Sequence, residues 1–371
     1  MTAQMNVLNG LPEEHVAAFE TLSKLREEKG LLSRPTGIPD DEVNGLNDDT
    51  ALLRFLRARK FDPNGAFKQF EQAITAHEKN HIYQLYNEIE VTAFESARAI
   101  YPHWTGRRAK NGLPVCMLDL AHLKATFSEY EKTRSAEAAG SWPEASITTA
   151  QGASVAHDSL IRFVFPLCTA MQDRPNPTTP IFSAIYIVDV SAFAIQVGWD
   201  SKNYVLDIGN LLMTGYAEVI DRILIVNAPS YFSMAWNIIK RWIDPGTANK
   251  VVIIKGSETL STLSKIIDPE NIPRSLGGGF EWANGKGPDI DRGIKEALEW
   301  LGEEELPLGP IKWVVDGAGR KTAVAVGAVD GTPRTKEIAR LKGSGKDVKA
   351  PADPEKTAEI EVSQSTQVEV N

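Results

Sequence analysis

Four apolar runs in the middle of the chain predict buried strands. They cover residues 115–118, 181–190, 223–227 and 251–254. Their hydrophobic positions are mostly continuous rather than alternating, which is typical of strands buried on both faces of a parallel sheet. Between the last three runs, apolar residues at helical spacing predict helices over about 204–219 and 230–243. Because strands and helices alternate, the pattern predicts an α/β fold with right-handed crossovers.

The N-terminal part of the chain predicts helices alone. A short helix is expected near residues 13–29, where apolar residues recur at helical spacing. Residues 47–50 offer side chains that can cap a helix over 52–60. Asp62 and Pro63 then end this helix and begin the next one. These elements predict an all-helical unit that precedes the α/β part.

The remaining segments carry weaker signals. Residues 129–158 are rich in Ala, Ser and Glu and are interpreted as an insertion loop, and a further helix is expected near 291–301. Residues 331–371 lack aromatic residues and mix Lys, Glu, Pro, Gly and Ser, which predicts a disordered tail. The expected division is a polar segment with a short helix (1–46), a helical unit (47–95), an α/β domain (96–285), an extension (286–330) and the tail (331–371).

Length and charge narrow the function classes. The chain has 371 residues and a formal net charge of −9, with 40 Lys+Arg against 49 Asp+Glu. This length suggests two or three structural units. The acidic balance argues against a general nucleic-acid binder, which needs clustered cations. Cys116 and Cys168 are too few for a disulfide framework, so a reducing compartment is the default expectation.

Membrane contact is expected to be peripheral. No apolar run reaches the roughly 18 residues that a membrane-spanning helix needs. The first residues lack the basic and apolar regions of a secretory signal. Neither an N-terminal Met-Gly nor a C-terminal CaaX motif predicts a lipid anchor.

The string His77-Glu78-x-x-His81 matches the HExxH motif of zinc hydrolases. On one helix, histidines four residues apart share a face and can hold zinc, with the glutamate as general base. The alternative is the solvent-facing end of an amphipathic helix. The buried stripe of that helix would be formed by Phe67, Phe70 and Ile74. No third ligand stands in a recognisable signature, and the zinc hydrolase is kept as an alternative function.

Two further stretches combine apolar and basic residues. In residues 52–60, cations stand among apolar neighbours, and they form either a solvated helix end or a phosphate site. Residues 230–243 are apolar nearly all round and include Trp236 and Trp242. Such a helix either belongs to the core, which its composition alone favours, or covers a hydrophobic cavity and meets lipid.

Taken together, these strings resemble the CRAL-TRIO lipid-binding family, and within it the fungal Sec-fourteen-like phosphatidylinositol transfer proteins. The most specific match runs from Asp48 to Asp62, DDTALLRFLRARKFD. Further matches are Tyr101-Pro102, Gly112-x-Pro114-Val115, Val188-Asp189, Ile225-Val226-Asn227-Ala228-Pro229, Asp244-Pro245-x-Thr247-x-x-Lys250 and Leu276-Gly277-Gly278. The resemblance covers roughly residues 45–285. It places the HExxH string in the family's N-terminal helical unit, which argues against zinc.

The resemblance implies a mainly parallel sheet that floors a deep apolar pocket for one lipid, closed by a mobile helical gate. Residues 230–250 correspond to this gate and its hinge. The gate residues expected to meet acyl chains or membrane are Phe232, Trp236, Ile239 and Trp242. The family's phosphatidylinositol head-group residues fall on Arg59, Glu218, Thr247 and Lys250. Three of these supply donors for a phosphate, and the Glu218 carboxylate can accept from an inositol hydroxyl.

The positions for a second ligand depart from the family pattern. Members that also carry phosphatidylcholine hold its phosphate with two Tyr and a Ser-x-Thr pair. The matching positions here are Thr105, Cys116, Ala184 and Tyr186, and none keeps the expected residue type. The resemblance therefore implies weak phosphatidylcholine exchange. It leaves open a second pocket ligand: a sterol, a fatty acid, another hydrophobe, or haem, which some relatives bind.

The expected function is a phosphatidylinositol-binding and transfer protein that extracts lipid from membranes and catalyses no covalent reaction. The expected ligand is the bound phospholipid, with neither a cofactor nor a metal. We expect a cytoplasmic monomer that meets endomembranes transiently and peripherally and binds no nucleic acid. A lipid-regulated signalling adaptor of the same fold is a second alternative, beside the zinc hydrolase.

Overall fold

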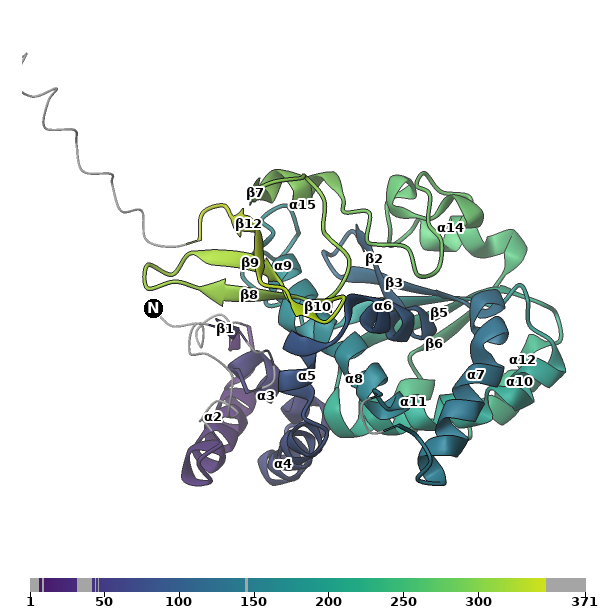
Figure 1. Ribbon diagram of the computed structural model, residues 1–371, viewed down its shortest axis with the longest axis horizontal. Coiled ribbons are helices and arrows are strands. Elements are labelled where there is room, and N and C mark those ends of the chain that lie inside the picture. The colour runs from purple at the N-terminus through teal and green to yellow at the C-terminus, as the bar shows by residue number, and fades with distance from the viewer. Residues whose placement is uncertain are drawn as a thin grey trace, which may run out of the picture.

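The N-terminal part of the chain is helical, as predicted. The computed structural model describes residues 7–8, 10–31, 42–43, 45, 47–143 and 146–344. Its first helices are α2 (Glu13–Glu28), α3 (Asp49–Ala58), α4 (Pro63–Lys79), α5 (Ile82–Glu88) and α6 (Val91–Ile100), seen in Figure 1. Asp48 caps α3 by accepting a hydrogen bond from the Ala51 N–H, and Asp62 caps α4 by accepting one from the Asn64 N–H. These caps confirm the boundaries that the polar residues indicated.

Helices α2, α3 and α4 share one hydrophobic core. Phe19, Leu22, Leu52, Phe55 and Phe70 are fully buried there. The rings of Phe55 and Phe70 meet edge to face, with centroids 5.5 Å apart. Burying each such side chain contributes about 1.5–3 kcal/mol, so this unit is held by packing.

The central sheet is mainly parallel, as predicted. It consists of β2 (His103–Arg108), β3 (Pro114–Asp119), β4 (Ala184–Asp189), β5 (Ile220–Ala228) and β6 (Val251–Lys255), in that spatial order. β2 pairs antiparallel with β3, and the other neighbours are parallel. The register places Cys116, Tyr186 and Ile223 side by side across β3, β4 and β5.

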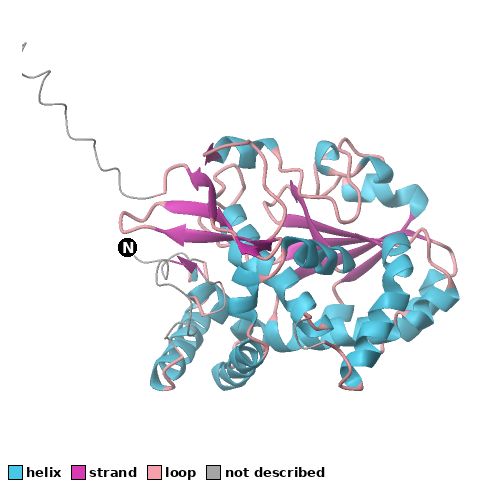
Figure 2. Cartoon of the chain, viewed as in Figure 1, coloured by secondary structure: helices cyan, strands magenta, loops and turns pink. Residues whose placement is uncertain are grey.

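Most helices of this domain lie on one side of the sheet (Figure 2). Those on this side are α7 (Leu120–Ala138), α8 (Thr149–Ser159), α10 (Ile195–Asp200), α11 (Lys202–Gly215) and α12 (Phe232–Ile239), and the short α13 (Pro245–Ala248) follows α12. The opposite face packs against η1 (Leu160–Val164), α9 (Phe165–Ala170) and α14 (Thr259–Leu263). Short turns of helix complete the domain at η2 (Gly256–Glu258), η3 (Pro269–Asn271) and η4 (Arg274–Leu276).

The insertion loop expected over 129–158 is wrong. Helix α7 continues to Ala138, and α8 begins at Thr149. Ala and Glu are strong helix formers, so the composition that suggested a loop favours helix instead. Thr148 and Gln151 form a capping box at the start of α8.

A second sheet is formed by strands of the C-terminal extension, by the start of the expected tail and by residues 42–43, and the sequence did not predict it. Its strands are β1 (Glu42–Val43), β8 (Ile311–Val315), β9 (Lys321–Ala325), β12 (Lys336–Leu341) and β7 (Leu298–Trp300), in that order and all antiparallel. Helix α15 (Arg292–Ala297) precedes it, so the helix expected over 291–301 ends four residues early. A small hairpin pairs β10 (Ala328–Val329) with β11 (Thr332–Pro333).

The expectation of disorder from residue 331 is therefore wrong for residues 331–344. β11 and β12 lie in this segment, and β12 pairs with strands on both of its sides. Ile338, Ala339 and Leu341 of β12 are buried. The segment needed no aromatic residue of its own, because it packs on a core that other strands supply. Residues 345–371 of the expected tail lie outside the described residues.

Trp313 anchors this second sheet to the α/β domain. Its side chain is almost fully buried, and its ring stacks on Phe163 with centroids 5.5 Å apart. The indole N–H donates to the Phe163 carbonyl at 3.0 Å. Within the described part of the chain, no helix is both long and apolar enough to cross a membrane.

Candidate functional site

An apolar cavity lies between the central sheet and the helices α7, α11 and α12. Its volume is about 220 Å³. The sheet contributes Val188, Ile223 and Ile225, and the helices contribute Ile208, Leu212 and Trp236, among others. No Lys or Arg belongs to its lining. A cavity of this composition suits a hydrocarbon and offers nothing inside to neutralise a charge.

Helix α12 covers the cavity and leaves apolar side chains outside. Phe232 is buried edge to face against Phe193, with ring centroids 4.8 Å apart. Trp236 and Ile239 line the cavity. On the outer side, Met234 is 69% exposed. Of the two sequence interpretations, core helix or cavity cover, the structure therefore supports the cover.

The outer side of α12 continues onto α10 as one apolar surface. Ile195 of α10 is 63% exposed, and Trp199 beside it is exposed as well. The Trp199 ring lies 6.1 Å from the ring of Trp242, which follows α12. Contiguous exposed apolar side chains of this kind mark interaction surfaces. We call this surface, formed by Ile195, Trp199, Met234 and Ile238, the outer apolar patch.

Three of the four expected head-group residues lie together beside the cavity. The Lys250 ammonium is 2.7 Å from the Glu218 carboxylate and donates to the Ile220 carbonyl at 2.7 Å. The Lys250 N–H donates to the Thr247 carbonyl at 3.0 Å. Thr247, Ile220 and the adjacent Val251 line the cavity. The Glu218–Lys250 ion pair is therefore at the border of the cavity and partly open to solvent.

Glu218 has an unusual backbone conformation. Its φ is +54°, in the left-handed region that side chains other than glycine rarely adopt. Such a conformation costs on the order of 1 kcal/mol and persists where the surrounding structure enforces it. It turns the chain between α11 and β5, at the point where the Glu218 carboxylate meets Lys250.

The fourth expected residue, Arg59, is not joined to this group. It is the exposed C-cap of α3, and within the described residues no hydrogen bond or ion pair links its side chain to Glu218, Thr247 or Lys250. Its neighbour Arg57 is placed differently. The Arg57 guanidinium lies over the Phe182 ring at 4.8 Å. Burial lowers the pKa of Arg57, and the negative charge of Glu218 opposes that shift.

Sequence reasoning included Arg57 only among the cations of residues 52–60, as a solvated helix end or a phosphate site. It did not predict the contact with Phe182 or the influence of Glu218, because both residues are distant in sequence. The contact joins the N-terminal helical unit to the α/β domain. It places a second cation near the Glu218–Lys250 pair.

Only one of the four positions expected for a second ligand lines the cavity. That residue is Tyr186, on β4. Thr105 is buried on β2, where its hydroxyl donates to the Val115 carbonyl at 2.9 Å. Cys116 and Ala184 are fully buried in the sheet. Burial raises the pKa of the Cys116 thiol, which stays protonated at neutral pH.

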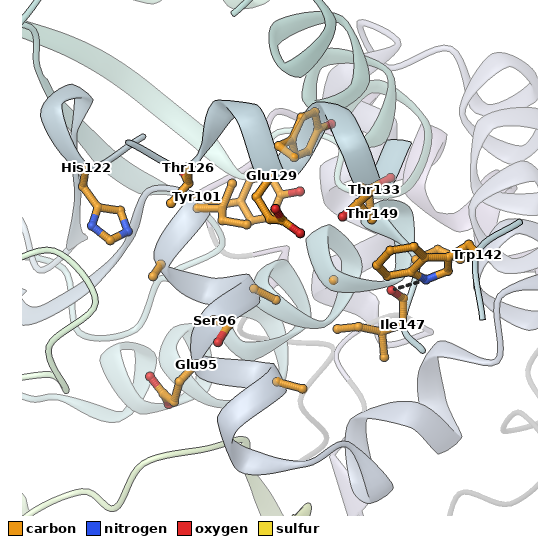
Figure 3. A pocket seen from close by; sticks show the side chains of 17 residues that line it. Glu95, Ser96, Tyr101, His122, Thr126, Glu129, Thr133, Trp142, Ile147 and Thr149 are labelled. Carbon is orange, nitrogen blue, oxygen red and sulfur yellow. Dashed lines mark hydrogen bonds between the residues drawn. The ribbon is translucent and has the colours of Figure 1, made fainter. Parts of the chain in front are cut away.

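A larger surface hollow of about 680 Å³ lies between α6, α7 and α8 (Figure 3). Several of its polar groups are already paired. The Trp142 indole donates to the Ile147 carbonyl, and the Thr149 hydroxyl donates to the Glu137 carboxylate. Tyr101 separates this hollow from the inner cavity, because its ring stacks on Tyr204 of the cavity lining. The apolar cavity under α12 is the better candidate site because its lining is almost entirely apolar and α12 covers it.

The zinc interpretation of His77 and His81 is contradicted by the local structure. Helix α4 ends at Lys79, and His81 starts α5 with a φ of +54°. The two histidines therefore do not share one helix face. His81 is exposed, whereas His77 is buried. Among the described residues, no group of three His, Cys, Asp or Glu side chains could hold a metal ion.

His77 is part of a buried polar cluster instead. Its Nε2 lies 3.2 Å from the Asp158 carboxylate and 3.2 Å from the Tyr216 hydroxyl. The Tyr216 hydroxyl donates to Asp158 at 2.7 Å. The solvent-facing alternative holds for Glu78, Lys79 and His81, which are exposed, but not for His77. The cluster links α4 to α8 and α11, so it ties the helical unit to the α/β domain.

Comparison with known families agrees with this architecture. The CRAL/TRIO domain matches residues 102–278, and the CRAL/TRIO N-terminal domain matches residues 19–72. The chain belongs to the CRAL-TRIO family. Within it, the chain is one of the Sec14-like proteins, as its relatives show.

Two of these relatives are yeast proteins named SEC14 cytosolic factor. That of Eremothecium gossypii is 27% identical over 277 residues, which cover 75% of this chain and 80% of the relative. That of Candida glabrata is 26% identical and covers 63% and 72%. The Arabidopsis thaliana phosphatidylinositol/phosphatidylcholine transfer protein SFH9 is 25% identical over 64% of this chain and 38% of its own length. Among solved structures, the crystal structure of Sfh5 aligns with a TM-score of 0.49 and 13% identity, covering 68% and 83%.

Proposed function

We propose that this protein binds phosphatidylinositol in the cavity and transfers it between membranes. The observation that carries the proposal is an apolar cavity covered by α12, with an ion pair at its border. A phospholipid matches this arrangement, because its hydrocarbon chains suit the apolar cavity and its charged phosphodiester suits the ion pair. The names of the relatives, which include phosphatidylinositol transfer and a cytosolic factor, support a cytosolic carrier.

The head group is expected to rearrange the Glu218–Lys250 pair. In the structure, the Lys250 ammonium donates to the Glu218 carboxylate and the Ile220 carbonyl. A phosphodiester beside Thr247 would take one donor from Lys250 and free a Glu218 oxygen for an inositol hydroxyl. The Arg57 guanidinium adds positive charge on the Glu218 side. Arg59 remains a proposed phosphate ligand. The C-terminal end of α3 would have to move for its side chain to reach the Glu218–Lys250 pair.

Lipid entry requires α12 to move. The cavity of about 220 Å³ is smaller than the roughly 300–1,000 Å³ of most small-molecule pockets. Helix α12 is short and is flanked by the turn at residues 229–231 and by Pro245. An outward movement of α12 would enlarge the cavity and present its apolar side chains to a bilayer. We therefore propose that the outer apolar patch meets the membrane transiently.

The proposal is tested by transfer of labelled phosphatidylinositol between vesicles. Lys250→Ala, and separately Glu218→Ala, should reduce transfer at least tenfold with the fold retained. Removing one partner leaves the other charge unpaired and removes a ligand for the head group. Lys255→Ala is the matched control, because Lys255 is an exposed lysine at the opposite end of β6 from Lys250. Transfer that survives both site substitutions would disprove the proposed head-group site.

The same transfer assay, run with labelled phosphatidylcholine, tests whether the protein selects the inositol head group. Wild-type transfer of phosphatidylcholine should be weak, because three of the four positions that would hold its phosphate do not reach the cavity. Strong exchange of both lipids would show that the cavity does not select the inositol head group.

A further inference from the structure

Glu218 stands between two hydrophobic cores. The residue before it, Ala217, is buried in the core of the helices α2, α3 and α4. The residue after it, Val219, is buried in the core of the central sheet, and its carbonyl accepts from the Ala184 N–H at 2.9 Å. The chain therefore passes from one core to the other over a single residue, and the left-handed φ of Glu218 lies at this crossing. The relative position of the two cores sets the backbone of Glu218.

The helical unit also holds the end of α11, directly before this crossing. On α4, the Gln69 side chain donates from Nε2 to the Met213 carbonyl at 2.6 Å. The backbone of Gly215 lies against the His77 ring, because a Cβ built on this glycine would be 3.4 Å from the ring Cε1. Two contacts from one helix of the helical unit thus fix the last turn of α11.

Tyr216 adds a buried polar contact to the same segment. Its hydroxyl lies 2.7 Å from the Asp158 carboxylate, 2.9 Å from the Ser154 carbonyl and 3.2 Å from the His77 Nε2. Burial raises the pKa of Tyr216, so the hydroxyl keeps its proton and donates. Asp158 is 1% exposed, so removing the hydroxyl would leave a buried acceptor with one donor fewer. Tyr216 is therefore tied to both α8 and α4, two residues before Glu218.

These contacts matter most when a head group is bound. The Glu218 side chain is 33% exposed and is paired with Lys250. A phosphodiester that takes a donor from Lys250 loosens this pair. The position of the Glu218 carboxylate then depends on its backbone, and so on the contacts at Met213, Gly215 and Tyr216.

We propose that the N-terminal helical unit positions Glu218 for the lipid head group, with Tyr216 and Gln69 as the positioning residues. The inference rests on the proposed function, because it assumes that Glu218 binds the head group. It goes beyond that function by assigning a role in binding to helices that lie outside the cavity. Neither Tyr216 nor Gln69 lines the cavity, so both act through Glu218 rather than by contact with the lipid.

A double-mutant cycle tests this role. Binding of labelled phosphatidylinositol from phosphatidylcholine vesicles to the purified full chain is measured after the vesicles are removed by centrifugation. Tyr216→Phe should weaken binding about fivefold, as expected for the loss of one hydrogen bond. In a Glu218→Ala chain, the same substitution should change binding by less than about twofold. A residue that acts only through Glu218 has nothing to position once that carboxylate is gone, whereas a merely structural residue costs the same in both chains.

Gln69→Leu provides an independent arm, because it removes the donor to the Met213 carbonyl and leaves Tyr216 intact. It should show the same dependence on Glu218, and it decides the test if Tyr216→Phe does not fold. Tyr83→Phe is the matched control. The Tyr83 hydroxyl belongs to the same helical unit and is buried, but it has no hydrogen-bond partner among the described residues. Its removal should leave phosphatidylinositol binding within about twofold of the wild type.

Two results would overturn the inference. One is a loss of binding by Tyr216→Phe and Gln69→Leu that is equally large with and without Glu218. The other is binding that both variants leave unchanged. Glu218→Ala alone separates this inference from the proposed function. If Glu218→Ala weakens binding while the two variants do not, the positioning role is wrong and the proposed function stands. If Glu218→Ala binds phosphatidylinositol like the wild type, both proposals fail.

Discussion

Ile187 and Ile223 are isoleucines of neighbouring strands in one sheet, yet their surroundings differ. Ile187 is fully buried in a core that α9 and α14 close. Ile223 is half-buried and lines the cavity under α11 and α12. The same contrast holds between Val226 and Val188. One face of the sheet is thus packed against protein, while the other borders the apolar cavity.

This difference teaches that burial and packing are separate properties. A continuous apolar run predicts that both faces of a strand avoid water. It does not say whether side chains or a lipid complete the contacts. The filled face should therefore provide stability, and the hollow face should provide binding at some loss of stability.

The largest expected effect is on the filled face. Ile187→Ala should lower the free energy of unfolding by about 3–5 kcal/mol, because it opens a void that its neighbours cannot close. Ile223→Ala should cost about 2 kcal/mol or less in lipid-free protein, since a space already adjoins the side chain. Urea unfolding of both variants measures the difference. Equal decreases in the free energy of unfolding would show that the two faces of the sheet are packed equally well.

Acid should weaken the fold through buried neutral histidines. Burial, with the nearby charge of Arg98, lowers the pKa of His103 to about 3. Its neutral ring is held by the Tyr101 carbonyl at 2.9 Å and by the Gly285 N–H at 3.2 Å. Below an unfolded pKa of about 6.5, the unfolded chain binds a proton that the folded chain does not. Stability should therefore fall as the pH is lowered from about 6.5 towards 3, by about 1.4 kcal/mol per pH unit for this group.

His103→Gln separates this effect from that of the hollow face. Between pH 7 and pH 4.5, the free energy of unfolding of the variant should fall less steeply with decreasing pH than that of the wild type. The difference in slope should correspond to one proton. The slope that remains includes His157, whose pKa burial also lowers. A slope unchanged by the substitution would show that His103 does not titrate on unfolding.

The smallest expected effect on stability belongs to the outer apolar patch. Met234→Glu places a charge on a side chain that is mostly exposed, so the free energy of unfolding should change by no more than about 0.5 kcal/mol. Sedimentation with phosphatidylcholine vesicles should show weaker binding, because the charge opposes entry into the bilayer interface. Leu308→Glu is the control, since Leu308 is also exposed but lies outside the patch. Unchanged vesicle binding by Met234→Glu would show that the outer apolar patch does not contact the membrane.

Much of the fold could be predicted from the sequence because its signals are local. The buried strands β3 to β6 and the caps at Asp48 and Asp62 follow from apolar runs and polar side chains. The second sheet could not be predicted in this way. Half of the residues of β12 are charged, and the strand pairs with β9 and β7, which are distant in sequence or separated by turns. A hairpin signal was present at residues 316–319, DGAG, between two apolar runs.

The site was predicted through resemblance and only in part. Glu218 and Lys250, 32 positions apart, are joined in the structure as the family pattern implied. The nearness of Arg57 to Glu218 depends on how two units pack, which no local pattern encodes. The same is true of His77, whose partners Asp158 and Tyr216 are far away in sequence. The HExxH string was therefore misleading as a metal motif.

The central claim is that the hollow face holds a lipid and that Lys250 retains its head group. Native mass spectrometry of the purified full chain tests it directly, by weighing the protein together with any lipid that co-purifies. The account predicts one phosphatidylinositol per chain in the wild type, lost in Lys250→Ala and retained in Lys255→Ala. A wild-type chain that carries no lipid after incubation with phosphatidylinositol vesicles, or a Lys250→Ala chain that retains phosphatidylinositol, would contradict it.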